Sequence, residues 1–232
     1  MKCIFCQNHT ISFDGNGKDI TQKELYNICK ELESLGAHNI NFVTPTPYTD
    51  KIIPVMKDLK KEGFKLPFVW NCGGYESLES VKSLDGLVDV YLPDFKYSDN
   101  ELAVKYSSAP GYYENAKAVL KEMRKQVKDV IDENDLMLKG LIIRHLVLPG
   151  EVNNSVGVLK AIKELLGTDV YVSLMSQYYP THKASSCDDL ARTLSAEEYE
   201  DVCRVFGELG FNNGFLQELS SATAEYIPDF FP

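Results

Sequence analysis

Several features that would assign this chain to a common class of protein are missing from its sequence. It has no apolar run of about 20 residues, so we expect no transmembrane helix, and the apolar stretch near Met1 is too short for a signal peptide. Basic residues are scarce, with 24 Lys and Arg against 34 Asp and Glu and a net charge of −10. This deficit argues against a nucleic-acid or anionic-membrane surface. We therefore expect a soluble cytoplasmic protein that binds neither nucleic acid nor a membrane.

Cysteines are too few and too scattered for a disulfide framework. Six occur in 232 residues, and a chain of this length can bury enough apolar surface to fold without disulfides. Free thiols in a reducing compartment fit this distribution better. Cys3 and Cys6 alone stand close together, followed by Gln7, Asn8 and His9, and the sequence has no second Cys-x-x-C pair.

Strand-like and helix-like segments alternate along the chain. Six short runs are rich in β-branched and aromatic residues and nearly continuous in hydrophobicity, which is typical of strands buried on both faces. These runs cover residues 39–45, 66–72, 87–95, 141–150, 169–179 and 214–219. Helical patterns lie between them. The alternation predicts an α/β fold of parallel strands with right-handed crossovers, in a single domain spanning residues 1–232.

Capping signals indicate where several helices begin. Capping boxes are expected for the pairs Thr21 with Glu24, Ser98 with Glu101, and Ser195 with Glu198. The residues after Cys6, 7–17, are interpreted as a loop, and the charged segment 121–140 as a solvated helix and turn. The first long helix has no strand before it, because residues 2–5 are too few. We therefore expect the first strand of the sheet to be missing.

Polar side chains gather where the predicted strands end. In parallel α/β sheets, ligands bind at the carboxyl ends of the strands. The residues expected on this rim are Thr44, Thr46, Asn71, Asp94, Lys96, Arg144, His145, Ser173, Ser176, Gln177 and His182. Taken singly, each has a structural interpretation: Asp94 and Lys96 can form a weak rim ion pair, and His145 can be a satisfied core histidine. Their common location is what indicates a site.

The Cys3-Ile-Phe-Cys6 turn is the sharpest feature of the sequence. Two thiolates at this spacing can hold one metal centre. A zinc site would need two further ligands. A thioredoxin-type redox pair normally follows a strand and opens a helix, and an iron–sulfur cluster usually takes three or four cysteines. From the residues alone, these alternatives stay open.

The segment CIFCQNHTIS resembles the cluster loop of radical S-adenosylmethionine (SAM) proteins, in the branch similar to pyruvate formate-lyase activating enzyme. The signature of that family is C-x-x-x-C-x-x-C. Further strand-end segments resemble the same branch, so the resemblance covers essentially the whole chain: NINFVTPTPY, VWNCGGYE, DVYLPDFKYSDNELAVKYS, IIRHLVLPG and SLMSQYYPTHKA. It implies a partial (β/α)6 TIM-like barrel. Cys3 and Cys6 match the second and third signature cysteines. The first would precede Met1, so we expect an N-terminally truncated chain.

The resemblance implies an enzyme with two cofactors, a 4Fe-4S cluster and SAM. Reductive cleavage of SAM would give a 5′-deoxyadenosyl radical that abstracts hydrogen from a substrate. By analogy, the substrate is a glycine of a partner glycyl radical enzyme, or else a small molecule. Flavodoxin or ferredoxin would supply the electron. With two thiolates instead of three, we expect this 232-residue form to hold a cluster weakly or not at all.

The resemblance also assigns roles to particular residues. Cys3 and Cys6 would ligate iron, and Phe5 between them would shield the cluster. The other expected roles are contacts of Thr44 and Thr46 with the SAM amino group, of Asn71 and Asp94 with ribose or a cation, of Lys96 and Arg144 with a SAM or substrate carboxylate, and of Gln177 and His182 with substrate. The family's second-strand Glu is absent at Thr44–Thr46, and Trp70 replaces a third-strand acid. Both departures weaken the assignments of SAM and cation contacts.

Two other functions are compatible with the residues. The chain could be a non-catalytic or zinc-binding degenerate barrel that keeps its dithiol. It could also be a barrel hydrolase or isomerase that uses Asp94, Lys96 and His145.

Overall fold

The computed structural model describes residues 1–223, which group into two compact units. Unit 1 comprises Met1–Gly17, Asp94–Glu114 and the chain from Ile143 onward, and unit 2 comprises Lys18–Pro93 and Asn115–Ile142. The expectation of a single domain stays a prediction.

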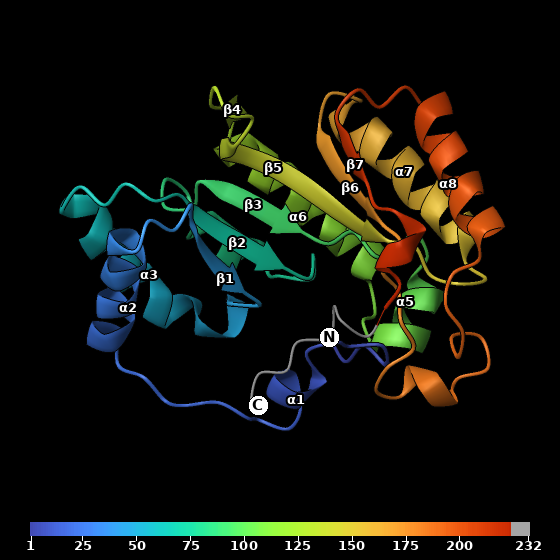
Figure 1. The fold of residues 1–232 in the computed structure, drawn as a ribbon, viewed down its shortest axis with the longest axis horizontal. Helices are drawn as coiled ribbons and strands as arrows, with labels where there is room; N and C mark the ends of the chain where they lie inside the picture. The colour runs from blue at the N-terminus through green and yellow to red at the C-terminus, as the bar shows by residue number, and fades with distance from the viewer. Residues whose placement is uncertain (224–232) are drawn as a thin grey trace. The chain divides into compact units, whose positions relative to one another are not determined.

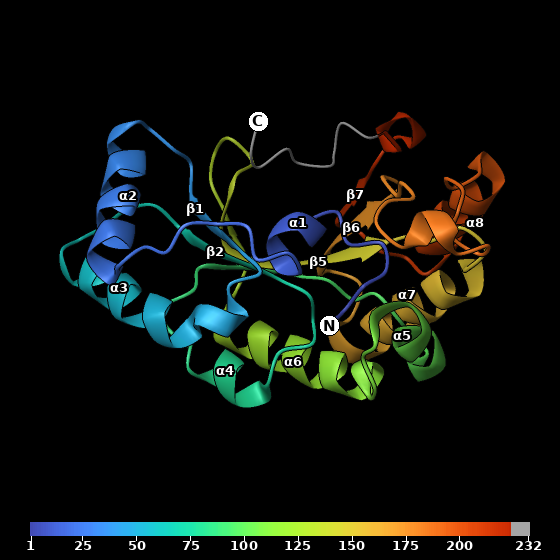
Figure 2. The same ribbon diagram turned by 90° about the horizontal axis from the view of Figure 1, so that it is seen from below.

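Unit 2 is built on parallel strands. β1 pairs with β2, β2 with β3, and β3 with β5, so the strand order is β1-β2-β3-β5. Helices α2 and α3 lie side by side in both views (Figures 1 and 2). The strands are β1 (Ile40–Val43), β2 (Phe68–Cys72), β3 (Val90–Pro93), β4 (Val130–Ile131) and β5 (Met137–Leu146), which continues into unit 1. The helices are α2 (Gln22–Ser34), the 3-10 turn η1 (Thr46–Tyr48), α3 (Thr49–Lys61), α4 (Leu78–Lys82) and α6 (Tyr112–Gln126), which begins in unit 1.

Unit 1 contains the N-terminal segment and the end of the sheet. Strand β6 pairs with β7 in parallel, and the order of strands there is β5-β6-β7. Helices α7 and α8 pack beside each other next to β6 and β7 (Figure 1). The elements are α1 (His9–Ser12), α5 (Asn100–Ser107), α7 (Val152–Leu166), β6 (Tyr171–Met175), η2 (Ala184–Ser186), α8 (Ala196–Glu208), β7 (Gly214–Leu216) and η3 (Leu219–Ser221).

The predicted α/β fold with parallel strands is confirmed. Every predicted strand run contains a strand. The capping boxes at Thr21 and Ser195 both form, with reciprocal bonds to Glu24 and Glu198. Helices α2 and α8 are followed closely by glycines with positive φ, Gly36 and Gly210, because a glycine adopts the left-handed conformation that ends a helix without steric cost.

Other local predictions are wrong. Asp99, not Ser98, caps α5, since the Asp99 carboxylate accepts the Glu101 N–H at 2.7 Å. The Ser98 hydroxyl instead donates to the Asn154 carbonyl at 3.0 Å. Residues 9–12, expected in a loop, form the short helix α1.

The charged segment 121–140 is also more structured than predicted. Helix α6 ends at Gln126, and β4 then pairs antiparallel with the start of β5. Exposed short strands of this kind have a weak hydrophobic pattern, so the sequence does not distinguish them from a turn. No helix within residues 1–223 combines the length and the apolar character needed to cross a bilayer.

Candidate functional site

The cysteine turn is fastened to the end of α5 in unit 1. The Lys2 N–H donates to the Ser107 carbonyl at 2.8 Å, and the Ile4 N–H donates to the Tyr106 carbonyl at 2.9 Å. Cys3 lies between these two bonds, and the Cys6 N–H returns to the Cys3 carbonyl at 3.3 Å. Both thiols are free and half-buried. Chain ends usually fray unless they are held in this way, so these contacts give the dithiol a defined position.

Phe5 closes one side of the turn. Its side chain is buried and meets the Tyr178 ring edge-on, with the ring centroids 6.0 Å apart. The Ala184 N–H also donates to the Ile4 carbonyl at 2.9 Å. Residues from the segment after β6 therefore hold the dithiol turn, and the side chain predicted to shield a cluster lies in an apolar contact.

Asp94, Lys96 and Arg144 form a partly buried ion cluster in the same unit. The Asp94 carboxylate receives the Lys96 ammonium at 2.5 Å on one oxygen and the Arg144 guanidinium at 2.7 Å on the other. The backbones of Asp94 and Arg144 pair as a parallel bridge, and the Phe95 N–H donates to the Arg144 carbonyl at 2.8 Å. Because two cations share one carboxylate, the cluster keeps an excess of one positive charge.

The charges in this cluster shift one another's proton affinity. Burial would raise the pKa of Asp94, but Arg144 and Lys96 outweigh it and hold that pKa below its ordinary value. Burial would likewise lower the pKa of Lys96, but the charges of Asp94 and Cys3 raise it. Asp94 and Lys96 are therefore charged at neutral pH.

The dithiol and the ion cluster act on each other electrostatically. The Cys3 charge raises the pKa of Lys96, and Lys96 in turn lowers the pKa of Cys6. Burial is nevertheless the largest influence on Cys6, and its pKa is raised overall, with Asn8 and Ser12 hydrogen bonds opposing the shift. The thiols and the cationic cluster therefore influence each other's charge, which suits an anionic group bound next to a thiolate-held metal.

The remaining predicted contact residues, Thr44, Thr46 and Asn71, lie in unit 2. The Thr44 N–H donates to the Asn71 carbonyl at 2.8 Å across the ends of β1 and β2. Thr44 has a φ of 51°, a rare value for a β-branched residue, and such strain often accompanies function. The structure joins these three residues at one sheet edge.

Sequence reasoning missed a carboxylate beside these threonines. Glu76 is 8% exposed, and the Thr46 hydroxyl donates to it at 3.4 Å. The Asn115 side chain donates to the Glu76 carbonyl at 2.9 Å and helps to hold the loop. The Gly73-Gly74 pair that precedes it, in a strand-end position, is the signal that could have drawn attention to Glu76.

Gln177 and His182 engage other residues of unit 1. Gln177 accepts from the Gln217 side chain at 2.7 Å. The His182 ring stacks on His9 and on Phe13, with centroid distances of 4.8 and 5.4 Å. His9 directly follows the dithiol turn, so the predicted substrate residue His182 is placed near the cysteines through aromatic contacts.

His145 is a core residue. It is fully buried, with Nδ1 2.7 Å from the Phe95 carbonyl and Nε2 2.8 Å from the Ser155 hydroxyl. Both ring nitrogens are thus occupied and no surface is left for a substrate. This geometry confirms the structural interpretation of His145 and gives no support to a hydrolase or isomerase that uses it.

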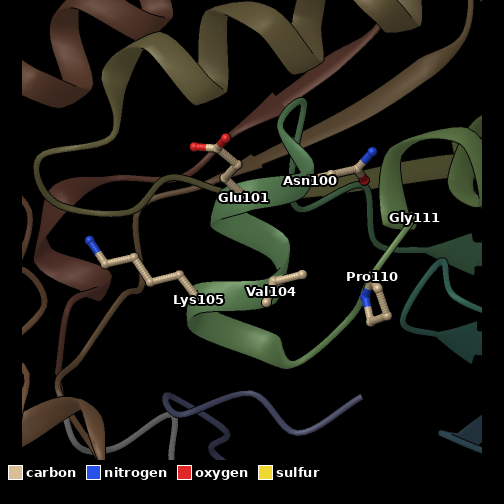
Figure 3. A pocket seen from close by; sticks show the side chains of 6 residues that line it. All are labelled: Asn100, Glu101, Val104, Lys105, Pro110 and Gly111. Atoms are coloured by element: carbon tan, nitrogen blue, oxygen red, sulfur yellow. The ribbon is translucent and has the colours of Figure 1, made fainter.

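A surface hollow of about 500 Å³ lies against α5, lined by Asn100, Glu101, Val104, Lys105, Pro110 and Gly111. The side chains of Glu101 and Lys105 both project from α5 (Figure 3). The hollow contains no group of reactive side chains that converge on one point. We therefore do not assign it to the chemistry.

The donor set fits an iron–sulfur cluster in part. Soft thiolate ligands select iron–sulfur clusters or zinc over oxygen-preferring cations. Cys3 and Cys6 supply two such ligands from one turn, the number expected of the second and third signature cysteines. Within residues 1–223 no group of three or more His, Cys, Asp and Glu side chains is arranged to hold a metal ion.

Comparison with known proteins gives a consistent result. The family model of the Radical SAM superfamily matches residues 1–156. The Uncharacterized protein MJ0674 of Methanocaldococcus jannaschii is 34% identical over 215 residues, which is 88% of this chain and 58% of that protein. The chain therefore spans little more than half the length of this relative.

Solved structures share the fold at low sequence identity. A domain of pyruvate-formate lyase-activating enzyme from Bacteroides vulgatus has a TM-score of 0.54 and 16% identity, covering 78% of this chain and 100% of the domain. Streptococcus suis SuiB bound to the precursor peptide SuiA has a TM-score of 0.65 and 12% identity, covering 97% of this chain and 48% of SuiB. SuiB bound to SAM gives the same TM-score and identity, covering 97% and 49%.

Proposed function

Because the chain belongs to the Radical SAM superfamily, whose model covers residues 1–156, we propose that it is a radical SAM enzyme. In this proposal Cys3 and Cys6 ligate an iron–sulfur cluster of the 4Fe-4S type. Such a cluster, when bound and reduced, supplies the electron that cleaves SAM to methionine and a 5′-deoxyadenosyl radical.

One observation carries the proposal: the dithiol turn and the Asp94–Lys96–Arg144 cluster belong to one compact unit, with Lys96 affecting the pKa of Cys6. Lys96 opposes the increase that burial causes in the Cys6 pKa, and so works toward the ionised form that binds metal. The excess positive charge also suits the carboxylate of SAM or of a substrate.

The residues of the ion cluster would bind the carboxylate of SAM or of the substrate together. An ammonium has three donors, and Asp94 takes one from Lys96, so Lys96 can bind a second anionic oxygen. Arg144 offers a planar fork for the same carboxylate. Asp94 would orient both cations. Phe5, packed on Tyr178, would exclude water from the cysteine turn.

Contacts of Thr44, Thr46 and Asn71 with SAM stay proposals drawn from the resemblance. Glu76 adds a carboxylate next to Thr46. It offers in unit 2 the type of group that the sequence lacks at Thr44–Thr46, where much of the family has Glu.

For the substrate we propose a glycine or another residue of a protein or peptide. Two observations on other proteins support this: one fold neighbour is a domain of an enzyme that activates pyruvate-formate lyase, and another, SuiB, was solved with a precursor peptide. A flavodoxin or a ferredoxin is the proposed electron donor.

SAM cleavage tests the proposal. The full-length protein is reconstituted anaerobically with iron and sulfide, reduced with dithionite and supplied with SAM, and 5′-deoxyadenosine is quantified. We expect product from the wild type and at least a hundredfold less from Cys6→Ser. Cys203→Ser is the matched control, because this thiol lies on α8 away from the cysteine turn in sequence and fold.

Two outcomes would contradict the proposal. One is the absence of 5′-deoxyadenosine from a protein that carries iron. The other is stoichiometric zinc retained after purification with no iron taken up, which would favour the zinc-binding alternative.

A further inference from the structure

Hydrogen bonds link three side chains, Tyr97, Ser107 and Cys3, in a series that ends on the Cys3 sulfur. The Tyr97 hydroxyl lies 2.6 Å from the Ser107 hydroxyl, and the Ser107 hydroxyl donates to Cys3 Sγ at 3.0 Å. Tyr97 and Ser107 are both fully buried. Cys3 and Ser107 are 104 residues apart in the sequence, so this hydrogen bond forms only when the unit is folded.

The direction of the hydrogen bonds follows from the chemistry of the groups. The Ser107 hydroxyl donates to the Cys3 sulfur, and it has a single proton, so that proton is committed to Cys3. Ser107 must then accept from Tyr97. Burial, together with the Cys3 charge, raises the pKa of Tyr97 well above its ordinary value, so its hydroxyl keeps the proton that it donates. The order is Tyr97 to Ser107 to Cys3.

The backbone supports the same contact. The Lys2 N–H donates to the carbonyl of Ser107 itself, and the Ile4 N–H to that of Tyr106. Cys3 is thereby bracketed by two main-chain bonds to the end of α5, from which Ser107 projects. This geometry leaves the hydroxyl little freedom to turn away from the sulfur.

Cys6 is bound differently. Its side chain interacts with the backbone of Asn8 and the hydroxyl of Ser12, and Ser12 is exposed on the four-residue helix α1. Water can replace an exposed donor at little cost, whereas nothing replaces a buried one. The two cysteines therefore differ in how firmly their hydrogen-bond donors are fixed.

We propose that Ser107, held by Tyr97, is a positioning residue that donates to the Cys3 sulfur and raises the reduction potential of the cluster bound there. The inference rests on the proposed function. Hydrogen bonds to ligand sulfurs are one of the means by which a protein sets the potential of an iron–sulfur cluster, since they draw electron density from the sulfur and favour the reduced, more negative state.

The primary test is a redox titration of the reconstituted full-length protein, followed by the spectrum of the reduced cluster. Ser107→Ala is expected to lower the equilibrium constant for reduction about tenfold, a midpoint about 59 mV more negative for one electron. Tyr97→Phe should act in the same direction by about twofold, because Ser107 keeps its proton but loses its orienting donor. Ser107→Thr should restore a value within about twofold of wild type.

Ser12→Ala is the matched control within the same turn, because it removes a hydroxyl from the other cysteine. We expect it to change the equilibrium constant less than twofold. A Ser107→Ala protein with a full cluster and an unchanged potential would overturn the inference, as would a Ser12→Ala shift of equal size. If Ser107→Ala fails to fold, the Tyr97→Phe titration decides, and no shift there also overturns it.

A second test uses the metal-free protein and separates this inference from the proposed function. A double-mutant cycle combines Ser107→Ala with Cys3→Ala in urea unfolding. The hydrogen bond predicts a coupling of about fivefold in the unfolding equilibrium constant, and additive effects would refute it. A wild-type protein that binds no iron would refute the proposed function and the effect on the reduction potential. The double-mutant cycle would still show whether the hydrogen bond between Ser107 and Cys3 forms.

Discussion

Acidification below about pH 6.5 is expected to destabilise the protein through His145. In the fold its Nδ1 faces the Phe95 carbonyl at 2.7 Å, which can only accept, so Nδ1 carries the proton. Nε2, at 2.8 Å, accepts from the Ser155 hydroxyl. The neutral ring thus has both nitrogens satisfied, and a second proton on Nε2 would force Ser155 to turn its hydroxyl away.

The size of the effect follows from the shifted proton affinity. Burial lowers the pKa of His145 from 6.5 to about 4. The unfolded chain therefore binds a proton before the folded chain does, and stability that is complete above pH 6.5 declines until about pH 4. At about 1.4 kcal/mol for each unit of pKa, the loss is roughly 2 kcal/mol at pH 5 and about 3 kcal/mol over the whole window. Against a typical total of about 5–15 kcal/mol, this is a large fraction.

Urea unfolding at pH 7.5, 6.5, 5.5 and 4.5 measures the decline. His145→Asn is the comparison, because the Asn amide reaches the Phe95 carbonyl from the position of Nδ1 and does not titrate. We expect the variant to be less stable at pH 7.5 but flatter between pH 6.5 and 4.5. Equal slopes for the two proteins would refute the reasoning, since other groups would then account for the acid sensitivity.

Three further predictions concern the ion cluster and helix α8. Lys96→Met should lower the free energy of unfolding in urea by roughly 2–3 kcal/mol, because the partly buried Asp94 carboxylate keeps Arg144 but loses the cation on its other oxygen. An unchanged midpoint would contradict this. Ser195→Ala should cost about 1 kcal/mol through loss of the α8 capping box, with iron uptake unaffected. Hydrogen bonds from Arg192, and from the Ser195 and Gly150 N–H groups, lower the pKa of Glu198 from 4.5 to about 2, so their stabilisation is present above pH 4.5 and is lost as the pH falls toward 2. The stability of Glu198→Gln, followed by acid titration, should not show this loss. A dependence of stability on pH identical to that of the wild type would refute the prediction.

Much of the architecture could be predicted from local sequence patterns. The apolar runs at 39–45 and 66–72 contain strands because a strand buried on both faces must be continuously hydrophobic. Thr21 and Ser195 cap helices because their partners Glu24 and Glu198 lie three residues on, a relation internal to one turn. The errors are also local. Asp99 rather than Ser98 caps α5, and the Ser98 hydroxyl donates to Asn154, which is distant in sequence.

The candidate site could be predicted only in outline. The types and approximate positions of Cys3, Cys6, Asp94, Lys96 and Arg144 were available from spacing and from the resemblance to radical SAM proteins. The Gly73-Gly74 pair marks a loop at a strand end, but it does not indicate that the Glu76 carboxylate in that loop is buried. Burial is a property of what packs around a residue.

The sequence by itself determined the alternation of strands and helices, the dithiol and the charged residues at strand ends, because each depends on spacings of a few residues along one segment. The tertiary structure decided which of these groups meet. Ser107 reaches the Cys3 sulfur, Arg144 pairs with Asp94, and the His145 ring is hydrogen-bonded to Phe95 and Ser155. Such contacts join residues far apart in the chain, and their hydrogen-bond partners and proton affinities come into being only when folding removes the water between them.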